Sequence, residues 1–215
     1  MSKELSQKQL FSKEYKLIEG LSPEFRECFG DLEEYFTMLI WGQSAQGKSN
    51  FVMQLCRELS KLGTILYLSL EESHALSLKN KVVQHLGALQ AETKIKFTDH
   101  TITFDELKER LKKKRSPRIV ITDSVQYLGL SFIQYKELKK LFPRKIWIFI
   151  SHAKGKIPDG KTADKIRYDA GLKIRVEGKI AFIESRYGGT KNFVIWEDGA
   201  KKYWGKDFKK MVNRR

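Results

Sequence analysis

Cysteine and long apolar runs are both scarce in this chain. Its 215 residues include two cysteines, Cys28 and Cys56, in no CxxC or Cys/His pattern, which excludes a disulfide framework and a structural zinc site. We expect two buried thiols instead. No apolar run approaches the length of about 18 residues that a membrane span needs, and residues 1–16 lack the apolar region of a signal peptide. We therefore expect a cytoplasmic protein without a membrane partner.

Acidic residues are few relative to basic ones. The chain carries 41 Lys and Arg against 26 Asp and Glu, which gives a formal net charge of +15 and a pI near 9.7. Such an excess indicates a polyanionic partner, although it is also compatible with solubility and a non-specific field. Hydrophobic residues make up 41% of the chain and charged residues 31%, a composition typical of a globular domain rather than of a disordered chain.

Apolar runs and amphipathic segments alternate between residues 36 and 151. Short apolar runs predict strands at 36–41, 64–70, 118–124 and 145–151, with a further short strand and edge at 95–98 and 101–103. Helical spacing predicts helices at 48–62, 73–86, 104–114 and 132–142. Strands that alternate with helices favour an α/β fold with a mostly parallel central sheet flanked by helices.

The pattern changes after residue 151. Residues 154–168 are polar and rich in Lys and Gly, which predicts a mobile loop. Glycine-containing turns separate three further strand patterns at 170–178, 179–188 and 191–199, which predict an antiparallel C-terminal extension of the sheet. The organisation that we expect is an N-terminal arm and lead-in at 1–35, a core at 36–200 and a basic C-terminal tail at 201–215.

A glycine-rich motif follows the first predicted strand. Residues 42–49 read Gly-Gln-Ser-Ala-Gln-Gly-Lys-Ser and match the pattern GxxxxGK[ST]. Between a strand and a helix, such a loop turns successive backbone N–H groups towards one phosphate chain, so Lys48 is expected to reach the β- and γ-phosphates and Ser49 to bind Mg²⁺. The alternative is a glycine-rich turn without a ligand. The predicted nucleotide-binding residues are Gly42, Gln43, Ser44, Ala45, Gln46, Gly47, Lys48, Ser49 and Asn50.

Acidic residues follow two other predicted strands. Asp123 ends the run 118–124, where it can deliver a carboxylate to Mg²⁺ beside the phosphate loop; the alternative is a helix N-cap. Glu71 follows the run 64–70, where a carboxylate can face the γ-phosphate and polarise water. The alternative is an exposed acidic turn that caps the next helix, and it weighs more for the neighbouring Glu72. The cofactors that these positions predict are ATP and Mg²⁺.

Together the three motifs resemble those of the RecA-like P-loop ATPase superfamily, which includes recombinases, DnaB-type replicative helicases, RadA/Sms-type proteins and KaiC-type ATPases. The local match is strongest to the RadA/Sms and DnaB branches: the stretch 66–73 resembles their second strand, which implies that Glu71 is the catalytic base. Asp123-Ser124-Val125 resembles the end of their Walker B strand. The resemblance covers about residues 36–200 and implies a RecA-like fold, in a single-domain core of the kind found in phages and mobile elements.

The same resemblance implies two further functional residues. His152 stands at the strand end that senses the γ-phosphate in these families; a histidine satisfied in the core or in a loop is the alternative. Arg186 matches an arginine of a Lys-x-Arg segment that reaches the nucleotide of the neighbouring subunit; an ordinary strand-end cation is the alternative. Glu184 departs from the family, which has Lys there, and Lys191 is a candidate substitute. The predicted catalytic residues are thus Lys48, Glu71, His152 and Arg186, and the predicted metal ligands are Ser49 and Asp123.

The segment after the fourth strand contacts DNA in RecA-like proteins, so the resemblance implies a DNA-binding role here. Long cations on a mobile backbone suit phosphate contacts, and the alternative is a solvated surface loop. In the tail, aromatic residues alternate with lysines, a pattern that can hold single strands by charge and stacking; docking of the aromatic residues onto the sheet is the alternative. The predicted DNA-binding residues are Lys154, Lys156, Lys161, Lys165 and Arg167.

The function that these features favour is an ATP-hydrolysing motor or switch that acts on DNA in replication or recombination, related to helicases or recombinases. The expected partners are single-stranded or branched DNA, further copies of the chain in a ring or filament, and a replication or recombination protein. Two alternatives stay open: a KaiC-like regulatory ATPase that acts on protein partners, and an accessory ATP-binding loader. The intact motifs favour catalysis over the loader, and the charge of +15 favours DNA over protein partners.

Overall fold

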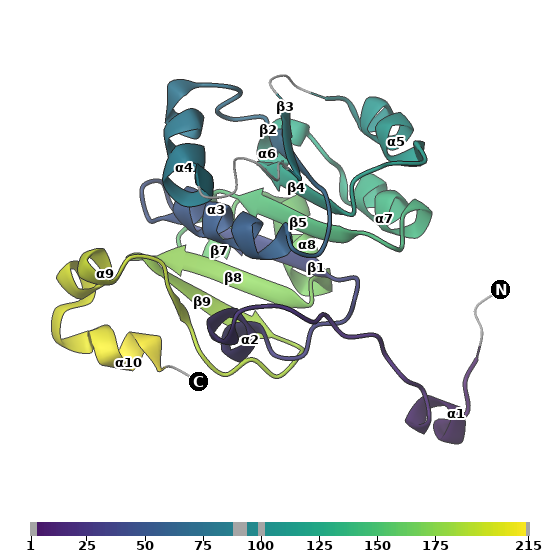
Figure 1. Ribbon diagram of the computed structural model, residues 1–215, viewed down its shortest axis with the longest axis horizontal. Coiled ribbons are helices and arrows are strands. Elements are labelled where there is room, and N and C mark those ends of the chain that lie inside the picture. Colours follow the sequence, from purple (N-terminus) through teal and green to yellow (C-terminus); the bar gives the residue numbers. More distant parts are fainter. Residues whose placement is uncertain (1–3, 88–93, 99–101, 214–215) are drawn as a thin grey trace.

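Eight strands form the central sheet of the computed structural model, which describes residues 4–87, 94–98 and 102–213 (Figure 1). The strands of the chain are β1 (Thr37–Trp41), β2 (Ile65–Ser69), β3 (Ile95–Thr98), β4 (Ile119–Asp123), β5 (Ile146–Ser151), β6 (Ala153–Lys154), β7 (Ile157–Pro158), β8 (Leu172–Glu177), β9 (Ile180–Ser185) and β10 (Phe193–Val194). Their order in the sheet is β10-β9-β8-β1-β5-β4-β2-β3, and β6 and β7 form a separate two-stranded hairpin.

The six strands from β8 to β3 run parallel to one another. β9 is antiparallel to β8, and β10 is antiparallel to β9. This confirms the expected mostly parallel sheet with an antiparallel C-terminal extension. Trp41 pairs with Ser151, and Ser69 pairs with Asp123, so β1, β5, β2 and β4 end at the same edge of the sheet. The segments that follow these four strands therefore meet at that edge, where α/β proteins bind their ligands.

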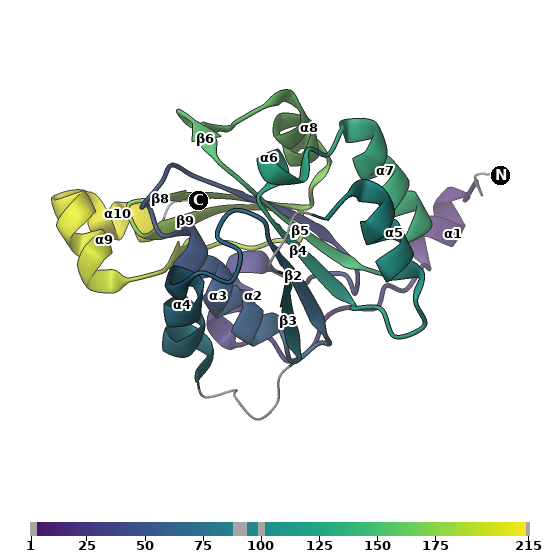
Figure 2. The same cartoon turned by 90° about the horizontal axis from the view of Figure 1, so that it is seen from above.

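Helices cover both faces of the sheet (Figure 2). One face carries α2 (Pro23–Phe29), α3 (Lys48–Leu59) and α4 (Leu76–Leu86), and the other carries α5 (Phe104–Lys112), α6 (Val125–Leu128), α7 (Phe132–Leu141) and α8 (Lys161–Asp169). The pleat of β1 divides its side chains between two cores: Met38 and Ile40 belong to the first, Leu39 and Trp41 to the second. A strand buried on both faces is apolar throughout, which is why the sequence predicts these strands well.

Several predicted elements are found with shifted ends. The helix predicted at 73–86 begins only at Leu76. β3 occupies 95–98 as predicted, but Ile102 and Thr103 are not in a strand, because Thr103 forms a capping box with Glu106 at the start of α5. Thr101 lies outside the described residues. Both cysteines are buried, as the sequence predicts.

The prediction of a mobile loop at 154–168 is wrong. The hairpin of β6 and β7 leads directly into helix α8. Ala163, Ile166 and Ala170 are buried at helical spacing against the second face of the sheet, and they hold one side of this polar segment in place. The lysines and glycines of the segment hid this narrow stripe, because two of its three members are alanines.

The C-terminal segment is more helical than the sequence predicts. The strand pattern at 191–199 forms a strand only at β10, because Glu197 and Asp198 open helix α9 (Glu197–Trp204), and acidic residues favour a helix N-terminus. The 3₁₀ turn η2 (Gly205–Asp207) and α10 (Phe208–Val212) complete the segment. The domain boundary expected at residue 200 therefore falls inside α9.

The N-terminal arm extends away from the sheet (Figure 1). Its short helix α1 (Gln7–Phe11) begins at a capping box between Ser6 and Gln9 and buries none of its own residues. Phe11 at its end is 94% exposed. Among the described residues, no helix is long and apolar enough to cross a lipid bilayer.

Candidate nucleotide-binding site

The glycine-rich motif connects β1 to α3. Gly42 lies so close to β8 that a Cβ on it would be 2.3 Å from the carbonyl oxygen of Val176. Gly47 has a φ of 115°, in the left-handed region that favours glycine, and caps α3, whose first residue is Lys48. The loop thus follows a buried strand and precedes a helix N-terminus, which is the setting in which backbone N–H groups bind phosphate.

The ammonium group of Lys48 is folded back onto the loop. Its Nζ donates to the carbonyl oxygens of Gly42 at 2.7 Å and Gln43 at 2.9 Å. Burial lowers the pKa of Lys48, and the carboxylates of Glu71 and Asp123 oppose this effect. A hydrogen bond from a cation is stronger when its acceptor is an anion, so a phosphate chain can displace these two neutral carbonyl groups.

A cavity of about 270 Å³ lies against the loop. Most of the predicted nucleotide-binding residues line it, together with Glu71 and both predicted metal ligands. Gly42, Gln43 and Gln46 instead border a neighbouring cavity of about 200 Å³. The residues around the larger cavity, which we call the loop cavity, are Ser44, Ala45, Gly47, Lys48, Ser49, Asn50, Glu71, Glu72, Lys81, Asp123, Ile150 and Lys179.

A buried tyrosine orients Asp123 at the end of β4. The hydroxyl group of Tyr67, on the adjacent strand β2, donates to Oδ2 of Asp123 at 2.6 Å, and Tyr67 is fully buried. Burial raises the pKa of Asp123 to about 6; the hydrogen bond from Tyr67 opposes the increase, and the charge of Glu71 adds to it. The alternative role of Asp123 as a helix N-cap is not found, because Ser124 holds that position in α6.

Glu71 and Glu72 both line the loop cavity but have different partners. Glu72 is tied to α4, where it accepts hydrogen bonds from Ser77 at 3.0 Å and from Lys81 at 2.5 Å. Oε2 of Glu71 lies 3.6 Å from Nε2 of His152, which follows β5 directly. His152 therefore contacts the predicted base, although it does not itself line the cavity.

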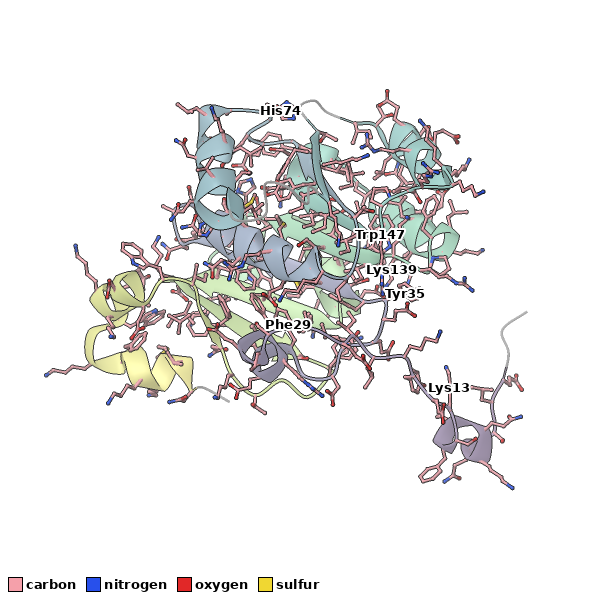
Figure 3. The ribbon with its side chains drawn as sticks, in the orientation of Figure 1. Lys13, Phe29, Tyr35, His74, Lys139 and Trp147 are labelled. Atoms are coloured by element: carbon pink, nitrogen blue, oxygen red, sulfur yellow. The ribbon has the colours of Figure 1, made fainter. Side chains whose placement is uncertain are left out.

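Arg186 lies at the opposite edge of the sheet from the loop. It follows β9, whose last residue pairs with the first residue of β8, whereas the loop follows the last residue of β1. Its guanidinium donates to the carbonyl oxygen of Tyr168 at 2.7 Å, near the end of α8. The structure therefore does not bring Arg186 to the loop cavity. A separate cavity of about 350 Å³ lies at that edge, and its lining includes Arg186 and three residues that Figure 3 labels, Tyr35, Lys139 and Trp147.

The residues near Arg186 that bear on a second cation are both paired. Nζ of Lys173 lies 4.0 Å from Oε2 of Glu184, whose side chain is largely exposed. Lys191 donates to Oε2 of Glu27 at 2.7 Å, so the candidate substitute for the missing lysine contacts the N-terminal helix α2 instead.

No protein-family model matches this sequence, and no curated protein matches it. Solved structures do match. The ATPase domain of a DnaB-like helicase superimposes with a TM-score of 0.55 and 14% identity, over 79% of this chain and 84% of that one. Flagellar accessory protein FlaH from Methanocaldococcus jannaschii has a TM-score of 0.56 and 17% identity, over 82% and 91% of the two chains. A KaiC-like protein from Pyrococcus horikoshii has a TM-score of 0.54 and 16% identity, over 80% and 88%.

The chain has the RecA-like P-loop fold. The comparisons confirm the fold that the three sequence motifs predict, and the likeness extends over most of the chain.

In this RecA-like fold, the cations predicted to bind DNA have different surroundings. Arg167 pairs with Asp164, with 2.9 Å between Nη2 and Oδ1. Nζ of Lys165 lies over the ring of Phe132, 5.5 Å from its centroid. The remaining three lie on the β6–β7 hairpin and at the start of α8, and all are exposed: Lys154, Lys156 and Lys161.

The aromatic residues of the tail also have different surroundings. Trp204 docks onto the sheet: its Nε1 donates to the carbonyl oxygen of Gly178 at 3.1 Å, and its ring packs edge-on against Phe182. Tyr203 is 54% exposed and lines the cavity of about 200 Å³, as does Lys156 on the hairpin. Docking therefore describes Trp204, while the ring of Tyr203 stays accessible.

Three residues at the loop cavity or its edge escaped the sequence analysis: Tyr67, Lys81 and Lys179. A tyrosine within an apolar strand signals burial only, and Lys81 is one of several polar residues on α4. Lys179 had a weak signal, since a Gly-Lys pair between two strand patterns marks a short turn. Only the pairing of distant strands brings these side chains to the loop.

Proposed function

We propose that this protein is an ATPase that binds ATP with Mg²⁺, hydrolyses it, and acts on DNA in replication or recombination. One observation carries the first part of the proposal: residues from three separate parts of the chain line one cavity, and they supply a phosphate-binding lysine, a hydroxyl group and two carboxylates. These are the groups that phosphoryl transfer to water requires. They are Lys48, Ser49, Glu71 and Asp123.

The donor set fits Mg²⁺ and a phosphate chain. Ser49 and Asp123 supply the hard oxygen ligands that Mg²⁺ prefers, and Tyr67 orients the carboxylate. When bound, Mg²⁺ neutralises charge on the phosphate oxygens. Lys48 leaves the two loop carbonyl groups and binds the phosphate chain, where its hydrogen bonds become charge-assisted.

Glu71 is the general base in this proposal. Its carboxylate lines the loop cavity, whereas both oxygens of Glu72 accept hydrogen bonds from α4. A carboxylate in this position can take a proton from a water molecule that attacks the γ-phosphate. His152, 3.6 Å from Glu71, lies between the base and the β6–β7 hairpin, so it can relate the state of the nucleotide to the position of the hairpin.

Arg186 can act only on the nucleotide of a second copy of the chain. β9 has six residues, so it spans about 20 Å, and Arg186 follows the end that is remote from its own loop. In a homo-oligomeric ring or filament, the guanidinium would stabilise the charge of the transition state at the neighbouring site.

Single-stranded or branched DNA is the partner that we propose. From residue 151 onward the chain carries 17 Lys and Arg against 8 Asp and Glu. The exposed Lys154 and Lys156 lie on the hairpin that begins directly after His152, which supports a link between phosphate contacts and hydrolysis. The accessible ring of Tyr203, on the same cavity as Lys156, offers a surface on which a base can stack.

A regulatory ATPase that acts on protein partners is the second candidate. It is favoured by the likeness to FlaH and to the KaiC-like protein, which covers a share of the chain similar to that of the helicase domain. An accessory loader that binds ATP without turnover is less well supported, because Glu71 and Asp123 line the same cavity as Lys48.

ATP turnover measured with and without single-stranded DNA separates these functions. We expect turnover that DNA stimulates and that Lys48→Ala abolishes, because this change removes the lysine of the loop. Turnover that DNA leaves unchanged, with no DNA binding at low salt in the presence of a non-hydrolysable ATP analogue, would favour the regulatory ATPase. ATP binding without turnover under both conditions would favour the loader.

A further inference from the structure

The tight turn between β8 and β9 lies against the glycine-rich loop. Its two residues, Gly178 and Lys179, have φ angles of 53° and 62°, both in the left-handed region. Two-residue hairpin turns with this geometry usually contain Asn, Asp or Gly. A lysine with a positive φ is uncommon, and such positions concentrate at functional sites.

Hydrogen bonds fix the backbone of this turn on the loop. The N–H of Gly178 donates to Oε1 of Gln46 at 2.7 Å, and the N–H of Lys179 donates to the carbonyl oxygen of Gln46 at 3.1 Å. On the other side, the carbonyl oxygen of Lys179 accepts a bond of 2.9 Å from the N–H of Ile195. The side chain of Lys179 therefore starts from a position that its neighbours define.

The side chain of Lys179 reaches into the loop cavity. Its stem passes beside Gly47, since a Cβ on that glycine would be 3.5 Å from Cδ of Lys179. Its ammonium donates to the carbonyl oxygen of Ala45. Lys179 lines the cavity with Lys48 and Ser49. It therefore lies over the same loop whose N–H groups face the phosphate chain in the proposed function.

Lys48 and Lys179 share one kind of partner. Both donate to carbonyl oxygens of the loop, which carry no net charge. The other lysine on this cavity, Lys81, pairs with the carboxylate of Glu72. A cation held by a neutral carbonyl group gains strength of interaction when an anion replaces that group. The arrangement therefore favours a ligand with several negative charges.

We propose that Lys179 is a second phosphate-binding cation of the nucleotide site, supplied by the β8–β9 turn of the same chain that supplies Lys48. The inference rests on the proposed nucleotide binding and adds a residue to it. When a nucleoside di- or triphosphate binds, Nζ of Lys179 exchanges the carbonyl oxygen of Ala45 for a phosphate oxygen. A nucleoside without phosphate gains nothing from this lysine.

Lys179→Gln and Lys179→Asn test this assignment, because both remove the charge and asparagine tolerates a positive φ. Lys206→Gln is the matched control, since Lys206 is an exposed lysine of η2 that does not line the loop cavity. In equilibrium titrations, we expect ADP and ATP to bind about tenfold more weakly to both Lys179 variants and unchanged to the control. Lys179→Arg should retain affinity within about threefold, because it keeps the charge. Adenosine should bind equally to all four variants and the wild type.

The outcomes separate this inference from the proposed function. If the wild type binds neither ADP nor ATP, the proposed function fails. If the wild type binds them and both charge-removing variants bind them equally well, nucleotide binding stands and the assignment of Lys179 is wrong. A parallel loss of adenosine and ADP affinity would mean that the substitutions distort the loop, and it would overturn the assignment as well.

Discussion

Lys179 and Arg186 flank the two ends of one strand, β9 (Ile180–Ser185), and are separated along it by about 20 Å. Lys179 lines the loop cavity of its own chain, whereas Arg186 lies at the opposite edge of the sheet. In the ring or filament that we propose, β9 therefore spans from one nucleotide site towards the next. Its central residues, Ala181 among them, are buried in the core, so the strand is held firmly along its length.

Replacement of the two adjacent glutamates should have different effects. Glu71→Gln should lower ATP turnover by about 100-fold or more and leave ATP binding intact, because an amide cannot take the proton of water. Glu72→Gln should keep most of the turnover and instead lower stability by about 1 kcal/mol, since Glu72 pairs with Lys81 on α4. Steady-state turnover and thermal unfolding of both variants check this. A larger loss of turnover in Glu72→Gln would place the base at Glu72.

Tyr67→Phe removes the hydroxyl group that donates to Asp123 and leaves the buried ring in place. Because outer hydrogen bonds hold a metal ligand in orientation, we expect the Mg²⁺ concentration for half-maximal turnover to rise about tenfold. Tyr135→Phe is the control, since Tyr135 is also buried but donates to Asp169, away from the loop cavity. An unchanged Mg²⁺ dependence in Tyr67→Phe would contradict the positioning role of Tyr67.

Mixing of two inactive variants tests the shared site. Lys48→Ala and Arg186→Ala should each lack turnover alone, and an equimolar mixture should regain about a quarter of the wild-type turnover, since that share of random interfaces joins the two intact halves. Lys48→Ala mixed with the double variant Lys48→Ala/Arg186→Ala is the control and should stay inactive. Absence of rescue, with subunits that still associate, would count against a role of Arg186 in a neighbouring site.

The exposed lysines should dominate the salt dependence of DNA binding. Replacement of Lys154, Lys156 and Lys161 by Ala should reduce the slope of log affinity against log salt by roughly 0.7 for each lost contact to a single strand. ATP binding should not change, because the phosphate loop is a separate element. Lys165→Ala and Arg167→Ala should each have smaller effects, since these cations contact Phe132 and Asp164. Binding titrations at several salt concentrations check this, and an unchanged slope in the triple variant would exclude these lysines from the interface.

Asp169 should make stability depend on acid pH. Burial alone would raise its pKa, but hydrogen bonds from Lys139 and Tyr135 outweigh this and lower the pKa from 3.8 to about 2. The folded protein therefore binds this proton less tightly than the unfolded chain, so the contribution is complete above about pH 4 and is lost as the pH falls towards 2. We expect Asp169→Asn to cost about 1–2 kcal/mol at pH 7, and less as the pH falls from 4 to 3. Urea unfolding of both proteins measures this, and a constant difference would contradict it.

Local features of the sequence determined the parallel core and most of the catalytic residues. The glycine-rich loop needs only its own eight residues between a strand and a helix, so the pattern at 42–49 was sufficient to place Lys48 and Ser49. Asp123 and Glu71 each follow an apolar run, and parallel strands bring the ends of such runs to one edge. The narrow stripe of α8 was lost because alanine gives a weak hydrophobic signal.

Tertiary structure decided every relationship that depends on which strands are neighbours. Tyr67 reaches Asp123 because β2 and β4 pair, and Lys179 reaches Ala45 because β9 turns back beside the glycine-rich loop. The same antiparallel return places Arg186 at the far edge of the sheet. Hydrophobic periodicity reports which side chains are buried, but strand order and register follow from how the two cores pack, and this packing involves residues that are distant in the sequence.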